Sequence, residues 1–287
     1  MKQRLLLFIT ALILCVGARS TTTQVINGLK YIIYTDRNCA TLISNNYTQS
    51  EIVIPAEITW EGKKYPVTEL GNSCFSKCSG LKSVTIPSSV TSLGKSCFYY
   101  SDLASVTIPS SVTSLGRGCF SSCYSLTSIT IPSSVTSLPG SCFSDCWNLK
   151  SITIPSSVTS LGDWCFKGCT KLTSITIPSS VTSLGESCFY DCQSLTSITI
   201  PSSVTSLGEN CFEYCPKLTS VTLPSSVTSL PRRCFNGCSS LTSITIPSSV
   251  TSLGEWCFEG CNFTSITVPS SVACLGDKCF QSCDGCI

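Results

Sequence analysis

Residues 126–146 read LTSITIPSSVTSLPGSCFSDC, and variants of this stretch fill most of the 287-residue chain. Its tetrapeptide of Ile, Val or Leu at the first and third places and Pro at the fourth begins at residues 52, 84, 106, 129, 152, 175, 198, 221, 244 and 266. From the third to the ninth copy the step is 23 residues each time. A period of roughly 20–50 residues indicates units that stack and cover one another. The sequence therefore predicts a solenoid of about ten units, the last one incomplete.

Each part of the unit has its own structural preference. Residues 128–131 alternate polar and apolar and are rich in β-branched residues, which predicts a strand with one buried face. Pro132 ends this strand, and the two serines after it form a corner. Val135 and Leu138 point inward from a second short extended piece. The Cys-Phe-x-x-Cys segment places apolar groups at i, i+1 and i+4, so we expect a short helical turn there.

These units resemble leucine-rich repeats, and most closely the BspA-like family of bacterial and protozoan surface proteins. The family signature, roughly L-x-S-I-x-I-P-x-S-V-x-x-I-G-x-x-A-F-x-x-C, matches residues 70–283. Cys74 and its equivalents replace the family's Ala, Leu replaces Ile before the Gly, and Ser134 stands where leucine-rich repeats usually carry an Asn ladder. The resemblance implies an α/β fold: a right-handed leucine-rich-repeat solenoid of short parallel strands with one helical turn per repeat. It also implies binding to host matrix proteins and other cells.

Residues 1–18 have the pattern of a signal peptide. Lys2 and Arg4 precede an apolar stretch, and a small-residue cleavage site follows at residues 16–18. Cys15 leaves lipid attachment open as an alternative. The apolar stretch is too short to span a bilayer stably, and no later segment is long enough. We therefore expect a secreted or cell-surface protein without a transmembrane segment after signal removal.

Residues 19–51 are expected to form a small N-terminal β cap, and residues 52–287 the leucine-rich-repeat solenoid. Asn27-Gly28 lies between apolar runs, which is a strong hairpin signal. The segment from Trp60 to Tyr65 predicts a second hairpin. No polar cap follows the last Cys-Phe-x-x-Cys pair, although solenoids need one.

The composition disfavours several functional classes. The chain has no histidine, which removes the commonest general base and the commonest metal ligand. Its net charge is +2 without a basic tract, so nucleic acid receives no electrostatic support. Its carboxylates are scattered. We therefore expect no enzymatic activity, no cofactor, no metal site and no nucleic-acid partner.

The 23 cysteines allow three interpretations. Zinc binding is disfavoured because the Cys-Phe-x-x-Cys spacing is wrong and histidine is absent. Equivalent cysteines of adjacent units could form a disulfide ladder. The interpretation we favour is that most of them are small buried groups that fill a tight corner, as the family's Ala does. Cys39, Cys274 and Cys286 stand outside the pattern and are better disulfide candidates.

Two sets of residues are candidate binding surfaces. The hydroxyl face is the outward Ser-x-Thr row of the first strand; its threonines are Thr85, Thr107, Thr130, Thr153, Thr176, Thr199, Thr222, Thr245 and Thr267. Such a row suits a polysaccharide or ice, but Ser and Thr are also ordinary exposed strand residues. The aromatic ridge consists of the variable residues beside the cysteines: Tyr100, Tyr124, Trp147, Trp164, Tyr190, Tyr214, Arg232, Arg233 and Trp256.

Aromatic and Arg side chains anchor protein interfaces, although drift between duplicated repeats would give the same variation. The function we expect is protein binding or adhesion at a cell surface, to a matrix protein, a surface protein of another cell or a glycan. The alternative is a structural envelope protein or glycan-contacting spacer without a specific protein ligand.

Overall fold

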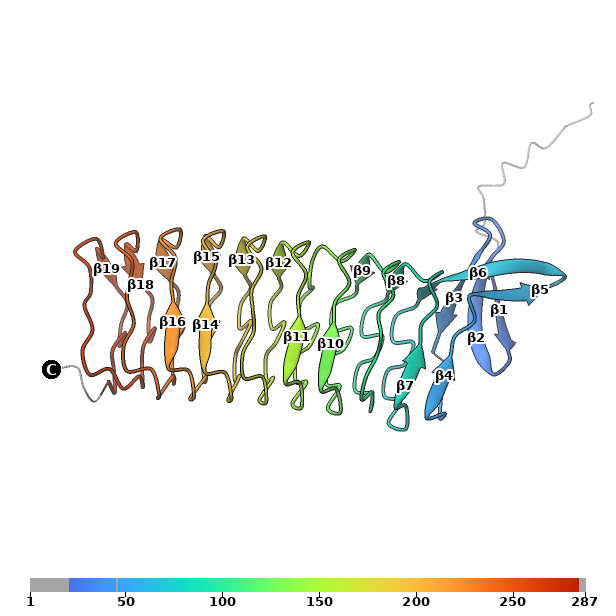
Figure 1. The fold of residues 1–287 in the computed structure, drawn as a ribbon, viewed down its shortest axis with the longest axis horizontal. Coiled ribbons are helices and arrows are strands. Elements are labelled where there is room, and N and C mark those ends of the chain that lie inside the picture. Colours follow the sequence, from blue (N-terminus) through green and yellow to red (C-terminus); the bar gives the residue numbers. More distant parts are fainter. Residues whose placement is uncertain (1–20, 45, 284–287) are drawn as a thin grey trace, which may run out of the picture.

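The computed structural model describes residues 21–44 and 46–283, which form a rod of stacked coils with a β cap at its N-terminal end (Figure 1). The predicted signal peptide at residues 1–18 lies outside the described residues. Successive coils present the same residues at the same places, so neighbouring strands pair in register; Ile129, for example, lies opposite Ile152. The predicted solenoid of parallel strands is confirmed.

Two hairpins build the N-terminal end of the rod, one within the predicted cap of residues 19–51 and one just beyond it. β1 (Thr21–Ile26) and β2 (Leu29–Tyr34) pair antiparallel, and the turn between them holds Asn27 and Gly28 at φ 50° and 78°. β5 (Glu57–Trp60) and β6 (Lys63–Leu70) form the second predicted hairpin. β3 (Cys39–Ile43) joins β2 to β6, and β6 pairs in parallel with the first coil. One sheet therefore runs from the cap into the solenoid.

Parallel strands line two sides of the rod (Figure 1). The first side carries the strands that open each unit, Ser-Ile-Thr or Ser-Val-Thr except in β4: β4 (Glu51–Val53), β7 (Ser83–Thr85), β10 (Ser128–Thr130), β11 (Ser151–Thr153), β14 (Ser197–Thr199) and β16 (Ser220–Thr222). The second side carries the Ser-Leu strands: β8 (Ser92–Leu93), β9 (Ser114–Leu115), β12 (Ser160–Leu161), β13 (Ser183–Leu184), β15 (Ser206–Leu207), β17 (Ser229–Leu230), β18 (Ser252–Leu253) and β19 (Cys274–Leu275).

The third side is made of turns, and the predicted helical turn per repeat is wrong: the described residues contain no helix. The residue before each cysteine of the Cys-Phe-x-x-Cys segment has a left-handed φ, as at Ser141 (58°) and Asp145 (58°). Alternate N–H groups consequently point along the rod, and the amide of Phe143 donates to the carbonyl of Cys165 in the next coil. Hydrogen bonds between coils replace the bonds within a segment that a helix needs.

The core is a ladder of identical side chains. Phenylalanine rings from Phe75 to Phe280 stack coil on coil with centroids 5.3–5.7 Å apart and planes within 13°. Tyr47 of the cap covers the first ring at 5.3 Å. The inward Val and Leu of each coil are buried as predicted, as Val135 and Leu138 show. Offset aromatic stacking adds about 0.5–1.5 kcal/mol per pair to the burial of each ring.

The serine at the usual Asn-ladder position makes a ladder of its own. The Ser157 hydroxyl donates to the carbonyl of Val135 one coil earlier at 2.7 Å, and Ser203 does the same to Val181 at 2.6 Å. The bond recurs from Ser111 to Ser271. A short hydroxyl thus satisfies the corner carbonyls that a longer amide satisfies in other repeats.

Candidate binding surfaces

The cysteines of the Cys-Phe-x-x-Cys pairs form two buried columns rather than a covalent ladder. Every cysteine of the Cys-Phe-x-x-Cys pairs is buried, and no disulfide joins any of the described cysteines. Cys39 and Cys274 are also free, so the disulfides predicted for them are absent; Cys286 lies outside the described residues. Burial raises the pKa of most of these thiols, to about 12 at Cys123, whereas hydrogen bonding with the Cys257 thiol lowers the pKa of Cys279. These columns are core, and no cluster of three or more potential metal ligands occurs in the part of the chain that the structure describes.

The hydroxyl face is solvent-exposed along its whole length. All nine of its threonines are exposed, and within residues 21–44 and 46–283 no hydrogen bond engages their hydroxyls. Threonines on the second side behave differently, because the hydroxyls of Thr91 and Thr251 donate to backbone carbonyls of the preceding coil at 3.2 Å. The hydroxyl face is therefore the side whose polar groups are left to solvent or a ligand.

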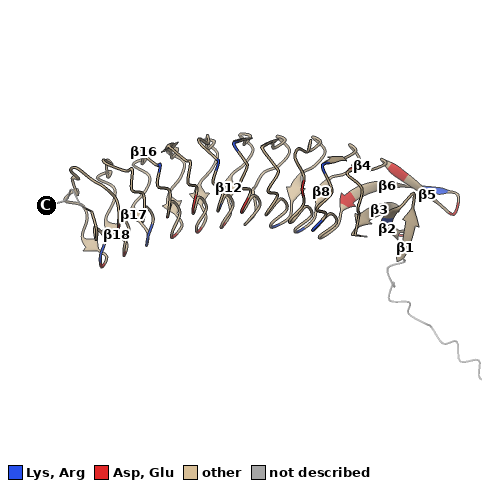
Figure 2. Cartoon of the chain, turned by 90° about the horizontal axis from the view of Figure 1, so that it is seen from below, with Lys and Arg blue, Asp and Glu red and all other residues tan. Residues whose placement is uncertain are grey.

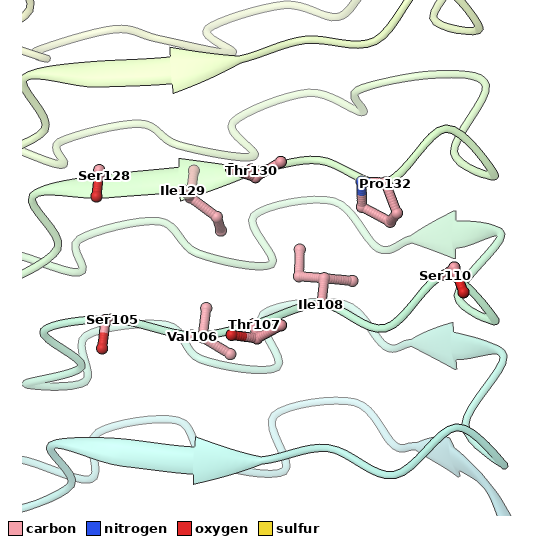
Figure 3. A pocket seen from close by; sticks show the side chains of 9 residues that line it. All are labelled: Ser105, Val106, Thr107, Ile108, Ser110, Ser128, Ile129, Thr130 and Pro132. Atoms are coloured by element: carbon pink, nitrogen blue, oxygen red, sulfur yellow. The ribbon is translucent and has the colours of Figure 1, made fainter.

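Three open grooves cross the hydroxyl face where strand pairing is interrupted. Parallel pairs form at β4·β7, β10·β11 and β14·β16, but no bridge or backbone hydrogen bond joins residues 105–108 to 128–131. A groove of about 380 Å³ lies there, lined by Ser, Thr and Pro with Val and Ile at its floor (Figure 3). Similar grooves of about 350 and 360 Å³ contain Thr176 and Thr245.

Charge is confined to other parts of the molecule. The stretches that carry both strand rows, such as residues 128–139 and 197–208, hold no charged residue. From residue 71 to 283 the Lys, Arg, Asp and Glu residues lie outside the strands; nearer the N-terminus they also occur within strands, as at Lys30 of β2, Glu51 of β4 and in the β5–β6 hairpin (Figure 2). The rod consequently has a neutral hydroxyl face and a turn side that carries both charge and the aromatic ridge.

The aromatic ridge lies on the turn side and divides into groups. Tyr100, Tyr124 and Trp147 come from three successive coils and form a row, with ring centroids 5.3 and 4.3 Å apart. Tyr100 and Trp147 are 48% and 50% exposed, so the row is held by its own contacts while its outer surface stays accessible. Among the predicted residues of the described chain, these three form the longest run of rings in contact.

The remaining ridge residues combine rings with cations. Arg117 lies over the Trp164 ring at 5.3 Å, and Tyr190 meets Tyr214 edge to face at 5.5 Å. Arg232 and Arg233 lie 4.8 and 4.7 Å from the Trp256 ring centre. Each guanidinium also approaches a carboxylate, so this end of the ridge is charge-balanced and offers no anion site.

Glu213 is a buried acid that no pattern in the sequence singled out. Its side chain is 2% exposed, and it accepts a hydrogen bond from Asn210 while Arg233 lies 3.9 Å away. Burial raises the pKa of this carboxyl, and the Asn210 hydrogen bond and Arg233 oppose that shift. Its carboxylate is the ion-pair partner of the ridge residue Arg233.

The repeat geometry described above agrees with the sequence profile of BspA-type leucine-rich-repeat regions, which matches residues 50–173 and 159–286. The chain belongs to the BspA-type leucine-rich-repeat family. No curated protein matches the sequence. No helix of the described residues is long and apolar enough to cross a membrane.

Solved structures similar to this BspA-type protein are bacterial leucine-rich-repeat proteins. A leucine-rich cell surface protein of Faecalibacterium prausnitzii is 28% identical over 94% of this chain and 95% of its own, with a TM-score of 0.54. A leucine-rich-repeat protein of Bacteroides ovatus (24% identity, 91% and 92% coverage, TM-score 0.55) shares the fold. The pneumococcal vaccine antigen PcpA (21% identity, 92% and 86% coverage, TM-score 0.58) shares it as well.

Proposed function

We propose that this BspA-type protein is exported and binds a partner protein at a cell surface through its aromatic ridge, with the row Tyr100–Tyr124–Trp147 as the anchor. Contact between the three rings is the observation that carries the proposal. Large aromatic side chains dominate the binding energy of protein interfaces when they fill pockets on a partner. The family and the Faecalibacterium cell surface protein support a surface location.

The arrangement of the row favours a binding role over neutral sequence drift between duplicated repeats. An isolated exposed ring loses conformational freedom when a partner immobilises it, which costs about 0.5–1.5 kcal/mol per side chain. Here each ring already rests on its neighbour, so little of that cost remains. The Asn148 amide donates to the Tyr124 carbonyl at 2.6 Å, which also fixes the backbone beneath the row.

The partner we favour is a protein of the extracellular matrix or of another cell's surface. No catalytic role is proposed, because the chain has no histidine and its ridge carboxylates pair with Arg or Asn side chains. An extended rod with open grooves suits a broad protein surface better than a small substrate.

Surface plasmon resonance against a panel of purified extracellular-matrix proteins tests the proposal. The variant combines Tyr100→Ser, Tyr124→Thr and Trp147→Thr, which are residues that other repeats carry at the same places (Ser122 and Thr170). We expect the triple variant to lose at least about 30-fold in affinity, the effect of one hot spot of about 2 kcal/mol.

The matched control is Gln193→Thr. Gln193 occupies the position equivalent to Trp147 two coils further along the rod, where no ring is present. It should bind like the parent protein. Equal binding by the triple variant, with thermal unfolding unchanged, would exclude the row as the anchor. A parallel variant, Trp164→Ser with Trp256→Asn, reports whether the rest of the ridge contributes.

Export is tested separately by sequencing the N-terminus of protein recovered from outside the cell. Cleavage after the small residues at 16–18 gives a chain that begins at Arg19. Recovery of the chain only inside the cell, with Met1 retained, would contradict the surface assignment.

A further inference from the structure

We propose that the three grooves of the hydroxyl face bind a linear, neutral polysaccharide that lies along the rod. This site is separate from the aromatic ridge, which lies on the turn side, so the inference stands whether or not the ridge binds protein.

The grooves are equivalent and evenly spaced. Thr107, Thr176 and Thr245 each line one groove, and they are separated by three 23-residue repeats. With neighbouring strands about 4.8 Å apart, adjacent grooves lie roughly 14 Å from one another along the rod. A repeating polymer that runs along the axis can therefore enter successive grooves in the same way.

The chemistry of the lining fits a sugar. Each groove presents Ser and Thr hydroxyls at its rim and Ile with Pro at its floor and end, as around Thr130 and Pro132 (Figure 3). Hydroxyls both donate and accept, as do those of a sugar, while the apolar floor contacts the C–H groups of the ring. The unjoined strands also leave backbone N–H and C=O groups of the two coils facing the groove.

The same lining disfavours charged polymers and favours long neutral chains over short ones. No charged residue lines any of the three grooves, so an acidic or basic polymer has no counter-charge there. No aromatic ring is available for stacking, which makes a single groove a weak site. Three grooves on one rigid rod raise the effective concentration of a polymer that already occupies one of them, so affinity should rise steeply with chain length.

The test is affinity electrophoresis in gels containing a soluble neutral polysaccharide: mixed-linkage β-glucan, glucomannan or pullulan, with polygalacturonate as the anionic comparison. The groove variant replaces Thr107, Thr176 and Thr245 by Val, which removes one hydroxyl from each groove without changing side-chain shape. The matched control replaces Thr85, Thr153 and Thr222, which belong to the same face but line none of these grooves.

We expect the parent protein and the control variant to be retarded by at least one neutral polymer, and the groove variant to bind at least 10-fold more weakly. Cellobiose and maltose should compete poorly because each occupies one groove only. The proposal is overturned if no neutral polymer retards the protein, if polygalacturonate binds best, or if both triple variants weaken equally. It is also overturned if the groove variant instead loses a matrix protein that the parent binds, since the grooves would then form a protein site. Unchanged thermal unfolding of both variants establishes that they are folded.

Discussion

The thiol of Cys146 donates a hydrogen bond to the carbonyl oxygen of Phe120, one coil earlier, across 3.1 Å. The same bond recurs in seven further coils, from Cys123 on Phe98 to Cys283 on Phe258, at 3.1–3.3 Å. From Cys123 onward, the second cysteine of each pair thus forms a polar link between coils, whereas the first cysteine occupies the position of the family's Ala. The two columns should respond differently to the loss of sulfur.

Replacing Cys146 by Ala should lower the free energy of unfolding by about 2 kcal/mol. The Phe120 carbonyl keeps the N–H of Cys123 as a donor at 3.2 Å. The change therefore costs the thiol hydrogen bond, about 1 kcal/mol, together with about 1 kcal/mol for the volume of the buried sulfur. Urea unfolding followed by circular dichroism measures the effect.

Cys142→Ala is the matched control, in the same coil and equally buried. Its cost should be about 1 kcal/mol or less, because only the small volume of one sulfur is lost. Equal costs at the two positions would mean that volume, and not the thiol hydrogen bond, sets the stability of the column.

Stability should fall steeply in alkali. Burial raises the pKa of the Cys123 thiol from 9.0 to about 12, and desolvation shifts Cys146 and Cys165 in the same direction. The folded state therefore holds these protons more tightly than the unfolded state. This stabilisation is fully present below about pH 9 and is lost as the pH rises towards 12.

Urea midpoints at pH 7, 8, 9 and 10 test this behaviour. The midpoints should be level up to pH 8 and then decline. The corresponding free energy of unfolding should fall by up to about 1.4 kcal/mol per pH unit for each thiol. Cys123→Ala should make the free energy of unfolding depend less steeply on pH, because one buried thiol no longer titrates. A midpoint that stays constant to pH 10 would contradict the assignment of these cysteines as buried thiols.

The coil could be predicted from the sequence because its signals are local and repeated. Alternation at residues 128–131, Pro132 at the strand end and the Asn27-Gly28 turn each prescribe a backbone state that the structure adopts. The helical turn was mispredicted because apolar spacing at Cys142, Phe143 and Cys146 is compatible with a helix and with a left-handed turn alike. Hydrogen bonds to the next coil decide between the two, and they are not encoded within one repeat.

The binding surfaces were predictable only in part. The position of the hydroxyl face followed from strand alternation, and all nine threonines are exposed as expected. The grooves could not be predicted, because repeats with nearly identical sequence pair at β10·β11 and separate between residues 105–108 and 128–131. The contact between Tyr124 and Trp147 depends on the stacking of coils, whereas the sequence alone indicated no more than their shared variability.

The serine ladder should contribute measurably to stability. Ser157→Ala removes the 2.7 Å hydrogen bond to the Val135 carbonyl and should lower the free energy of unfolding by about 1 kcal/mol. Ser156→Ala, the exposed serine beside it, should change it by less than about 0.5 kcal/mol. Equal effects, or none at Ser157, would show that solvent satisfies the corner carbonyl equally well. Chemical denaturation of the three proteins under one set of conditions gives the comparison.

The backbone conformation of Trp164 should lower the stability of the folded protein. Its φ of 56° lies in the left-handed region, which costs an L-residue roughly 1–2 kcal/mol, and the equivalent positions hold Gly118 and Asn210. The cation–π interaction of the Arg117 guanidinium with the Trp164 ring stabilises the folded protein by about 0.5–1 kcal/mol. Trp164→Asn should therefore raise the free energy of unfolding by about 0.5 kcal/mol, because Asn tolerates this φ better.

A double-mutant cycle with Arg117→Ala separates the two contributions to the effect at Trp164. Arg117→Ala alone should destabilise the protein by about 0.5 kcal/mol and should have no effect once Trp164 is Asn. If Trp164→Asn instead destabilises by more than about 1 kcal/mol, packing of the ring outweighs the backbone strain and the residue is structural. If stability rises while affinity for the partner of the ridge falls, the strain is retained for binding, as local strain commonly is at functional sites.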